Sequence, residues 1–313
     1  MTDVLGIHHV TAIAADPQAN YEFYANVLGM RLVKRSVNQD DPGTYHLFYA
    51  DAAGHPGSDL TFFPWRHLAP GRPGTGQITQ TLLSIPKGTL DFWATRLGEA
   101  GVTTLRRETR FAEPMLAFND PHGLGVALVE TGDARDFTPW PRSPIPSERQ
   151  ITGIHAVGIP VRSAAPTAGT LESVLGFTRL ATEGPWHRYG PAGGGSGAYV
   201  DLREAPDDPP GRQGAGSVHH VAFRVADDVV QAAVRARVQA AGLRPTPVID
   251  RFWFKSVYFL EPGGVLFELA TDGPGFAVDE DANHLGETLV LPPWLEPQRA
   301  EIEARLPPLQ NGQ

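Results

Sequence analysis

An internal repeat constrains the fold of this chain more than any other feature of its sequence. The segment GIHHV at 6–10 recurs as GIHAV at 153–157, 147 positions later (153 − 6). The same displacement relates VLGM at 27–30 to VLGF at 174–177, so no insertion or deletion separates the two matches. Self-similarity at a fixed distance indicates that one structural unit is used more than once.

A second displacement, of 141 positions (241 − 100), relates AG at 100–101 to AG at 241–242 and PHG at 121–123 to PGG at 262–264. Together the matches divide the chain into four modules, at 4–65, 76–131, 151–205 and 216–272. The Pro-rich stretch 138–146 reads as a linker between the halves. We therefore predict two tandem domains, at 1–137 and 151–280, followed by a Pro-rich C-terminal extension at 281–313.

Each module has the same local pattern of hydrophobic residues. A short apolar strand comes first, then a helical stretch such as Pro17–Leu28 or Val229–Ala241, and then several segments rich in Val, Leu, Phe and Tyr. Segments of this last kind include Thr44–Ala50, Leu60–Phe63, Val126–Val129 and Val265–Leu269. The pattern predicts a βαβββ unit and an α+β protein. In the extension, Trp294–Leu306 is expected to form a helix docked on the body.

Composition excludes several kinds of site and partner. The 313 residues are 41% apolar, which supplies a hydrophobic core, and contain no cysteine, so a metal would need His, carboxylate or water ligands. The formal charge is −9 with scattered Lys and Arg, which argues against nucleic acid as a partner. The sequence has neither a signal-peptide pattern nor an apolar run of about 18 residues, so we expect no membrane partner and a soluble, cytoplasmic protein.

Four of the eleven histidines form two adjacent pairs, each at the start of a predicted strand: His8 with His9, and His219 with His220. Successive residues of a strand point to opposite faces. One imidazole of each pair is therefore expected to face a concave sheet interior while its neighbour faces elsewhere. Any single strand histidine is more often a hydrogen-bonded structural residue, but two matching pairs favour a shared site.

Glu268 is a charged residue inside the apolar segment GGVLFEL, where an unpaired carboxylate would be costly. The repeat shows what the equivalent positions hold elsewhere. His9 aligns with Ala156, His220 with Thr79, and Glu268 with Ala127. The polar residues thus occur together in modules one and four, as a shared site requires.

Two imidazoles and one carboxylate leave coordination positions open on a metal, an arrangement typical of non-haem Fe(II) enzymes. Mn(II) accepts the same ligands, and Zn(II) is the less favoured alternative. A zinc peptidase would carry H-E-x-x-H on a helix, a string that the sequence lacks. We therefore expect His9, His220 and Glu268 to bind one divalent ion.

At these residues the chain resembles the vicinal oxygen chelate superfamily, and within it ring-cleaving dioxygenases of the hydroquinone-dioxygenase type. The similarity covers nearly the whole chain. It includes HHVT at 8–11, LVK at 32–34, YHL at 45–47, HH at 219–220, PGG at 262–264 and LG at 285–286.

This resemblance implies paired βαβββ modules that curl into curved mixed-sheet half-barrels, and it implies the same three metal ligands. It also implies that the substrate is a small dihydroxyaromatic compound, of hydroquinone or catechol type, opened with O₂. The residues that match polar positions around the family's substrate are His8, Thr11, His219, Arg251 and Tyr258. Without the resemblance, Arg251 would read as a surface charge and Tyr258 as an ordinary strand aromatic.

Two other functions fit the same fold. A glyoxalase-like isomerase or lyase would commonly use a second carboxylate, and the segment Leu60–Pro64 offers none. A resistance protein that sequesters a small molecule without a metal would leave the histidines and Glu268 unexplained. The substrate, the choice of Fe(II) or Mn(II), the acid or base and the oligomeric state stay open, although exposed edge strands could pair in a homo-oligomer.

Overall fold

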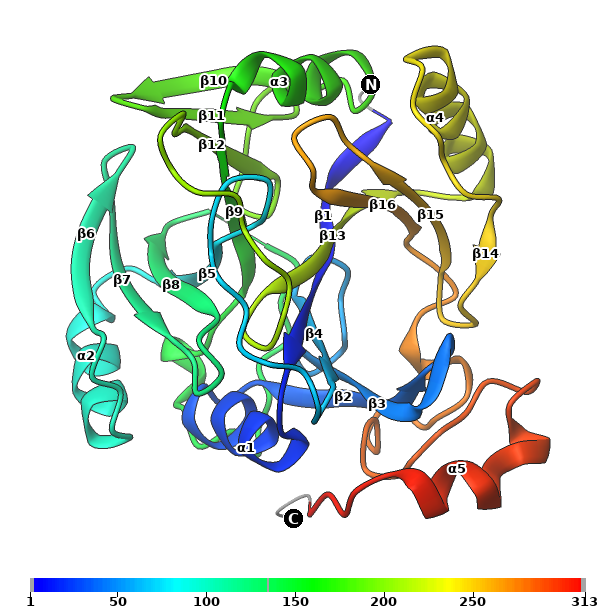
Figure 1. Ribbon diagram of the computed structural model, residues 1–313. Helices are drawn as coiled ribbons and strands as arrows, with labels where there is room; N and C mark the ends of the chain where they lie inside the picture. Colours follow the sequence, from blue (N-terminus) through cyan, green and yellow to red (C-terminus); the bar gives the residue numbers. More distant parts are fainter. Residues whose placement is uncertain (1–2, 134, 311–313) are drawn as a thin grey trace.

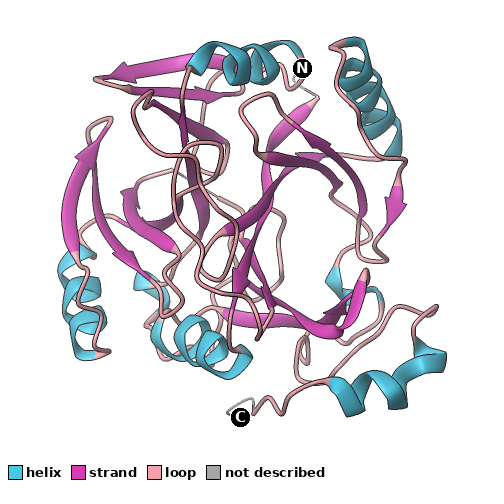
Figure 2. Ribbon diagram, in the orientation of Figure 1, coloured by secondary structure: helices cyan, strands magenta, loops and turns pink. Residues whose placement is uncertain are grey.

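The computed structural model describes residues 3–133 and 135–310 of the chain. Within these residues, sixteen strands form two eight-stranded sheets, with helices around the periphery (Figures 1 and 2). The α+β class and the four βαβββ modules are confirmed. Residues 1 and 313, the outer limits predicted for the first domain and the extension, lie outside the described residues.

The first two modules follow the predicted order of elements. The first contains β1 (Val4–Ala14), α1 (Pro17–Tyr21), the π-helix η1 (Glu22–Val27), β2 (Arg31–Asn38), β3 (Asp41–Ala50) and β4 (Asp59–Pro64). The second contains β5 (Gln80–Pro86), α2 (Leu90–Glu99), β6 (Arg106–Arg110), β7 (Glu113–Asn119) and β8 (Gly125–Thr131). Helix α1 begins where Asp16 accepts the backbone N–H of Ala19 at 2.8 Å, with Pro17 in the first turn.

The last two modules repeat the plan after the linker and the short 3₁₀ helix η2 (Ser147–Arg149). The third contains β9 (Gly153–Val161), α3 (Ala164–Ser173), β10 (Thr178–Glu183), β11 (Trp186–Gly190) and β12 (Tyr199–Glu204). The fourth contains β13 (Val218–Val225), α4 (Asp228–Ala240), β14 (Ile249–Asp250), β15 (Lys255–Leu260) and β16 (Leu266–Thr271).

Each sheet combines modules from different halves of the chain. The first sheet has the strand order β14-β15-β16-β13-β1-β4-β3-β2, and so joins module four to module one. The second has the order β10-β11-β12-β9-β5-β8-β7-β6, and joins module three to module two. The two modules of each sheet are joined by an antiparallel strand pair, β1 with β13 in the first sheet and β9 with β5 in the second. The predicted domain limits at 137 and 151 stay a prediction, and hydrogen bonding between strands crosses from one predicted half to the other.

A large core cluster packs the outer faces of both sheets against the helices, and smaller clusters lie on the inner faces. The inner face of the second sheet holds Ala127 and Ala156, the residues that align with Glu268 and His9. It also holds a buried network of charges. The Arg188 guanidinium donates to Asp201 from Nε at 2.7 Å and to Glu113 from Nη1 at 2.7 Å.

The C-terminal extension packs on the first sheet. It contains the 3₁₀ turns η3 (Phe276–Val278) and η4 (Glu296–Gln298) and the helix α5 (Arg299–Arg305). The predicted helix at 294–306 is thus present but begins later, after a 3₁₀ turn that contains Pro297. Leu295 and Ile302 are buried in a cluster with Val37 of β2. Among the described residues, no helix has the length and apolar character that a membrane crossing needs.

Asp201→Asn should lower the free energy of unfolding by about 3 kcal/mol, because it leaves the buried Arg188 guanidinium without its main counter-charge. Urea denaturation followed by circular dichroism measures this loss. The control is Asp91→Asn, which removes an ion pair with Arg107 between side chains that are 91% and 56% exposed and should cost less than about 1 kcal/mol. Equal losses in the two variants would contradict a structural role for the network.

Candidate metal centre

The strand register of the first sheet brings three predicted ligands to one point on its inner face. In β1 and β13, Thr11 stands opposite His220 and His9 opposite Ala222. In β13 and β16, Ala222 stands beside Glu268. Because residues two apart on a strand share a face, His220 and Ala222 point the same way, and His9 and Glu268 converge with them.

The three side chains are almost fully buried and their donor atoms nearly touch. His9 Nε2 lies 3.2 Å from His220 Nε2. Glu268 Oε2 lies 3.2 Å from His9 Nε2 and 2.8 Å from His220 Nε2. Ligands at right angles around an ion with bonds of about 2.1 Å are separated by about 3 Å, so these spacings fit a divalent ion.

Protonation also favours a cation between these atoms. Oε2 of Glu268 is buried without a hydrogen-bond donor, while Oε1 accepts the hydroxyl of Ser256 at 2.5 Å. Burial raises the pKa of Glu268, but His9 and His220 outweigh it and hold the pKa well below its usual range. A carboxylate that faces two ring nitrogens needs a proton or a metal among them, and the donor set suits a metal.

The outer histidine of each pair contacts its inner partner. Nδ1 of His8 lies 3.0 Å from Nδ1 of His9, and Nδ1 of His219 lies 2.8 Å from Nδ1 of His220. The two residues of a pair therefore do not point to opposite faces, as a regular strand would predict. Both pairs fall at register shifts of the β1–β13 ladder, and such a bulge redirects a side chain.

These contacts are compatible with the tautomer that a metal would require of His9 and His220. Burial, together with the adjacent His9 and His220, lowers the pKa of His8 and of His219 to about 3, so both outer rings are neutral. If the Nδ1 of the neutral outer ring is unprotonated, it can accept a hydrogen bond from the Nδ1–H of the inner ring. In that tautomer the Nε2 atoms of His9 and His220 carry lone pairs that face each other, as metal ligation requires.

Thr11 contacts the same centre. Its Oγ1 lies 3.0 Å from His220 Nε2 and 2.8 Å from Thr61 Oγ1. Thr61 Oγ1 in turn lies 2.9 Å from His46 Nε2. A line of polar contacts therefore runs from His46 on β3 to His220 on β13.

A small cavity opens beside the three ligands, and Arg251 and Tyr258 line it, as the resemblance implied. Arg251 forms a bidentate pair with Asp40, at 2.8 and 3.2 Å, across the mouth of the cavity. Burial and the Glu268 carboxylate raise the pKa of Tyr258 above its usual value, so its hydroxyl keeps its proton and can donate.

Several residues of the cavity were missed by sequence reasoning. His46, which the sequence analysis does not single out, lines the cavity. The other unforeseen lining residues are mostly aromatic, and they include Phe48, Phe63, Trp253 and Phe254. The alternation of His46 with Phe48 on β3, and of Thr61 with Phe63 on β4, was the available signal, since each pair shares a face.

Asp59 is a second carboxylate near the centre. It lies just before the segment 60–64 and stands in register with His9 in the β1–β4 pairing. It is 1% exposed, and neither carboxylate oxygen has a hydrogen-bond partner. Asp59 is not among the described residues that line the cavity.

The comparisons with known proteins agree with this geometry. The model of the Glyoxalase/Bleomycin resistance protein/Dioxygenase superfamily matches residues 6–128 and 153–269. A protein of Bacillus subtilis (strain 168) named "Putative ring-cleaving dioxygenase MhqA" is 44% identical, over 98% of this chain and 99% of its own. The "Chlorohydroquinone/hydroquinone 1,2-dioxygenase" of Sphingobium indicum is 33% identical, over 96% of this chain and 95% of its own. A crystal structure described as a putative dioxygenase from B. subtilis superposes with a TM-score of 0.92 at 42% identity, covering 99% of both chains.

Asp59 should make the metal-free protein less stable as the pH rises. Burial raises the pKa of Asp59 from 3.8 to about 7, so folding favours its protonated form. Its contribution is fully present below about pH 4 and is lost as the pH passes 7. Asp59→Asn should therefore unfold at higher urea than the wild type at about pH 8, by up to about 4 kcal/mol, with the difference vanishing near pH 4. If the stability difference between the variant and the wild type did not change with pH, the pKa of Asp59 would be the same in the folded and unfolded states.

Proposed function

The chain belongs to the glyoxalase/bleomycin resistance protein/dioxygenase superfamily, and we propose that it is a metal-dependent ring-cleaving dioxygenase that opens a dihydroxyaromatic compound with O₂. The observation that carries the proposal is the convergence of the buried side chains of His9, His220 and Glu268 beside a small cavity lined by aromatic rings. The names of its relatives point to the same reaction. We assign hydroquinones as the first substrates to test, with catechols as the alternative.

We propose Fe(II) as the ion, with Mn(II) as the alternative. Fe(II) suits a set of two imidazoles and one carboxylate that leaves positions free for other ligands. When bound, the ion would supply a Lewis acid that lowers the pKa of a substrate hydroxyl and a redox centre for O₂.

The chain itself supplies the surroundings of the reaction. The rings of Phe48, Phe63 and Trp253 line the cavity beside His9 and His220, and we expect these apolar walls to contact an aromatic substrate and to limit access of water. Arg251 and the protonated Tyr258 hydroxyl are placed to stabilise negative charge on a substrate oxygen. His8 and His219 act chiefly by orienting His9 and His220, and His219, which is less enclosed than His8, is the candidate acid or base.

The ligand assignment predicts that His9→Ala, His220→Ala and Glu268→Gln each lower metal affinity by more than about 100-fold, since losing even an outer hydrogen-bond partner costs about 10–100-fold. Metal content after dialysis, measured by elemental analysis, gives the readout, and circular dichroism checks the fold. His187→Ala, which changes a histidine on β11 of the other sheet, should keep its metal. Full metal content in any of the three variants would remove that residue from the site.

The reaction is tested by O₂ uptake. Protein purified without oxygen, analysed for metal and then loaded with Fe(II), should consume about one O₂ per molecule of a hydroquinone or catechol, with loss of the aromatic absorbance. Mn(II)-loaded and Zn(II)-loaded protein are the controls for the choice of ion. Bound metal without O₂ uptake would favour an isomerase or lyase, and aromatic binding without metal would favour a binding protein.

A further inference from the structure

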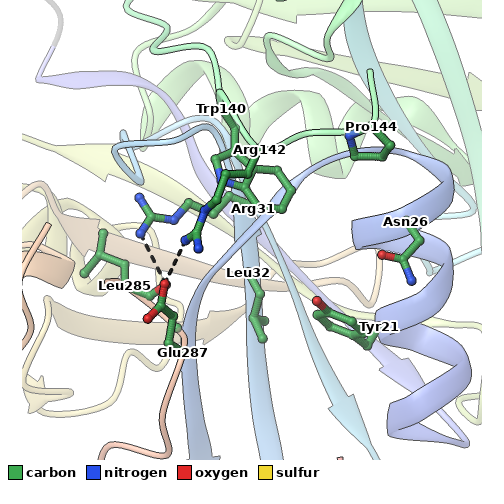
Figure 3. A pocket seen from close by; sticks show the side chains of 10 residues that line it. Tyr21, Asn26, Arg31, Leu32, Trp140, Arg142, Pro144, Leu285 and Glu287 are labelled. Carbon is green, nitrogen blue, oxygen red and sulfur yellow. Dashed lines mark hydrogen bonds and ion pairs between the residues drawn. The ribbon is translucent and has the colours of Figure 1, made fainter. Parts of the chain in front are cut away.

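A second cavity, of about 400 Å³, lies where three segments of the chain meet. Ligand pockets commonly measure about 300–1,000 Å³. Its walls come from α1, η1 and β2 of the first module, from the linker at 140–144, and from the extension at 285–287 (Figure 3). It shares no described lining residue with the cavity at the histidines. Two of its walls therefore belong to segments outside the repeated modules.

Close backbone approaches hold these two walls in place. A Cβ on Gly286 would lie 1.9 Å from the carbonyl oxygen of Leu32, so only glycine lets the extension pack against β2 here. A Cβ on Gly29 would lie 2.3 Å from Cγ1 of Ile145 in the linker. The Ser143 hydroxyl also donates to the Gly29 carbonyl at 2.7 Å. The pocket is thus a built feature of the fold rather than a gap between loose loops.

Two guanidinium groups line this pocket together with one carboxylate. Arg31 is buried, and its Nη1 donates to the carbonyls of Ala52 and Ala282 at 2.6 and 3.0 Å. Arg142 is 57% exposed, and its Nη2 donates to Glu287 at 2.7 Å (Figure 3). Burial and the charge of Arg142 lower the pKa of Arg31, while Glu287 opposes this shift. The lining therefore carries an excess of one positive charge.

The rest of the lining is flat and largely apolar. Tyr21 and Trp140 present aromatic rings, and Leu285 presents an aliphatic side chain. Figure 3 shows Tyr21 and Trp140 on different walls, with the two arginines next to Trp140 and Glu287 below them. We propose that this pocket binds a small organic monocarboxylate with a flat apolar body, whose carboxylate pairs with Arg142 and whose body lies against Trp140 and Tyr21. A planar guanidinium fork matches a carboxylate in two hydrogen bonds, and one negative charge balances the lining.

Benzoate, benzamide and inorganic phosphate test this proposal on the full-length, metal-free protein by isothermal titration calorimetry. Benzoate should bind with a dissociation constant of about 1 mM or below. Benzamide has the same shape without the charge and should bind at least about tenfold more weakly, the value of one charge-assisted pair. Phosphate lacks the apolar body and should also bind more weakly.

Two variants test whether benzoate binds in this pocket. Arg142→Gln removes an exposed charge and should weaken benzoate about tenfold, and Asn26→Trp should fill the cavity with a similar loss while keeping Arg142. The matched control is Arg107→Gln, which breaks an exposed Arg–Asp pair elsewhere and should leave benzoate affinity unchanged.

Three results would overturn the assignment. The first is that benzoate does not saturate the protein up to about 10 mM. The second is that Arg142→Gln and the wild type bind benzoate with the same affinity. The third is that only Arg251→Gln loses affinity, which would place the ligand in the other cavity. Binding of phosphate as tight as that of benzoate would overturn the carboxylate class. None of these results depends on metal loading or on O₂ uptake, so failure here is separate from failure of the proposed reaction.

Discussion

The antiparallel pairing of β1 with β13 is the contact on which the rest of the first sheet depends. It joins the first module to the fourth, and it brings His9 beside His220 although they are 211 residues apart in sequence. Closing so long a loop costs chain entropy, and the ladder with its buried apolar residues offsets that cost. Neither module alone holds enough donors for an ion, so the proposed centre can form only when both ends of the repeat meet.

The register of that pairing also sets the chemistry. Two of its three register shifts fall at the adjacent histidines, and at each of these an outer imidazole contacts the Nδ1 of an inner one. The inner rings are thereby held in one orientation, with Nε2 atoms facing Glu268. A uniform ladder would have sent His8 and His219 to the other face, where they could not orient anything. Each His-His pair thus combines a donor and its support in two consecutive residues.

The sequence predicted the modules, the class of fold and the convergence of His9, His220 and Glu268, because the repeat shows where polar residues replace Ala and Thr in equivalent units. It could not predict that module one pairs with module four, since self-similarity defines a unit but not its partner. It also missed His46, whose position in the cavity depends on how β3 lies beside β4 and across from Arg251. Roles that require three-dimensional register are invisible to a comparison along the chain.

The second sheet shows why the scaffold and the site should be considered separately. It has the same strand order as the first, yet Ala156 and Ala127 occupy the positions of His9 and Glu268, and its interior is closed by Arg188, Asp201 and small apolar side chains. The fold therefore does not require a metal centre on either inner face. The linker and the extension are additions to the repeat, and both contribute walls to the arginine-lined pocket, so new ligand sites in such a chain are best sought where these added segments meet the modules.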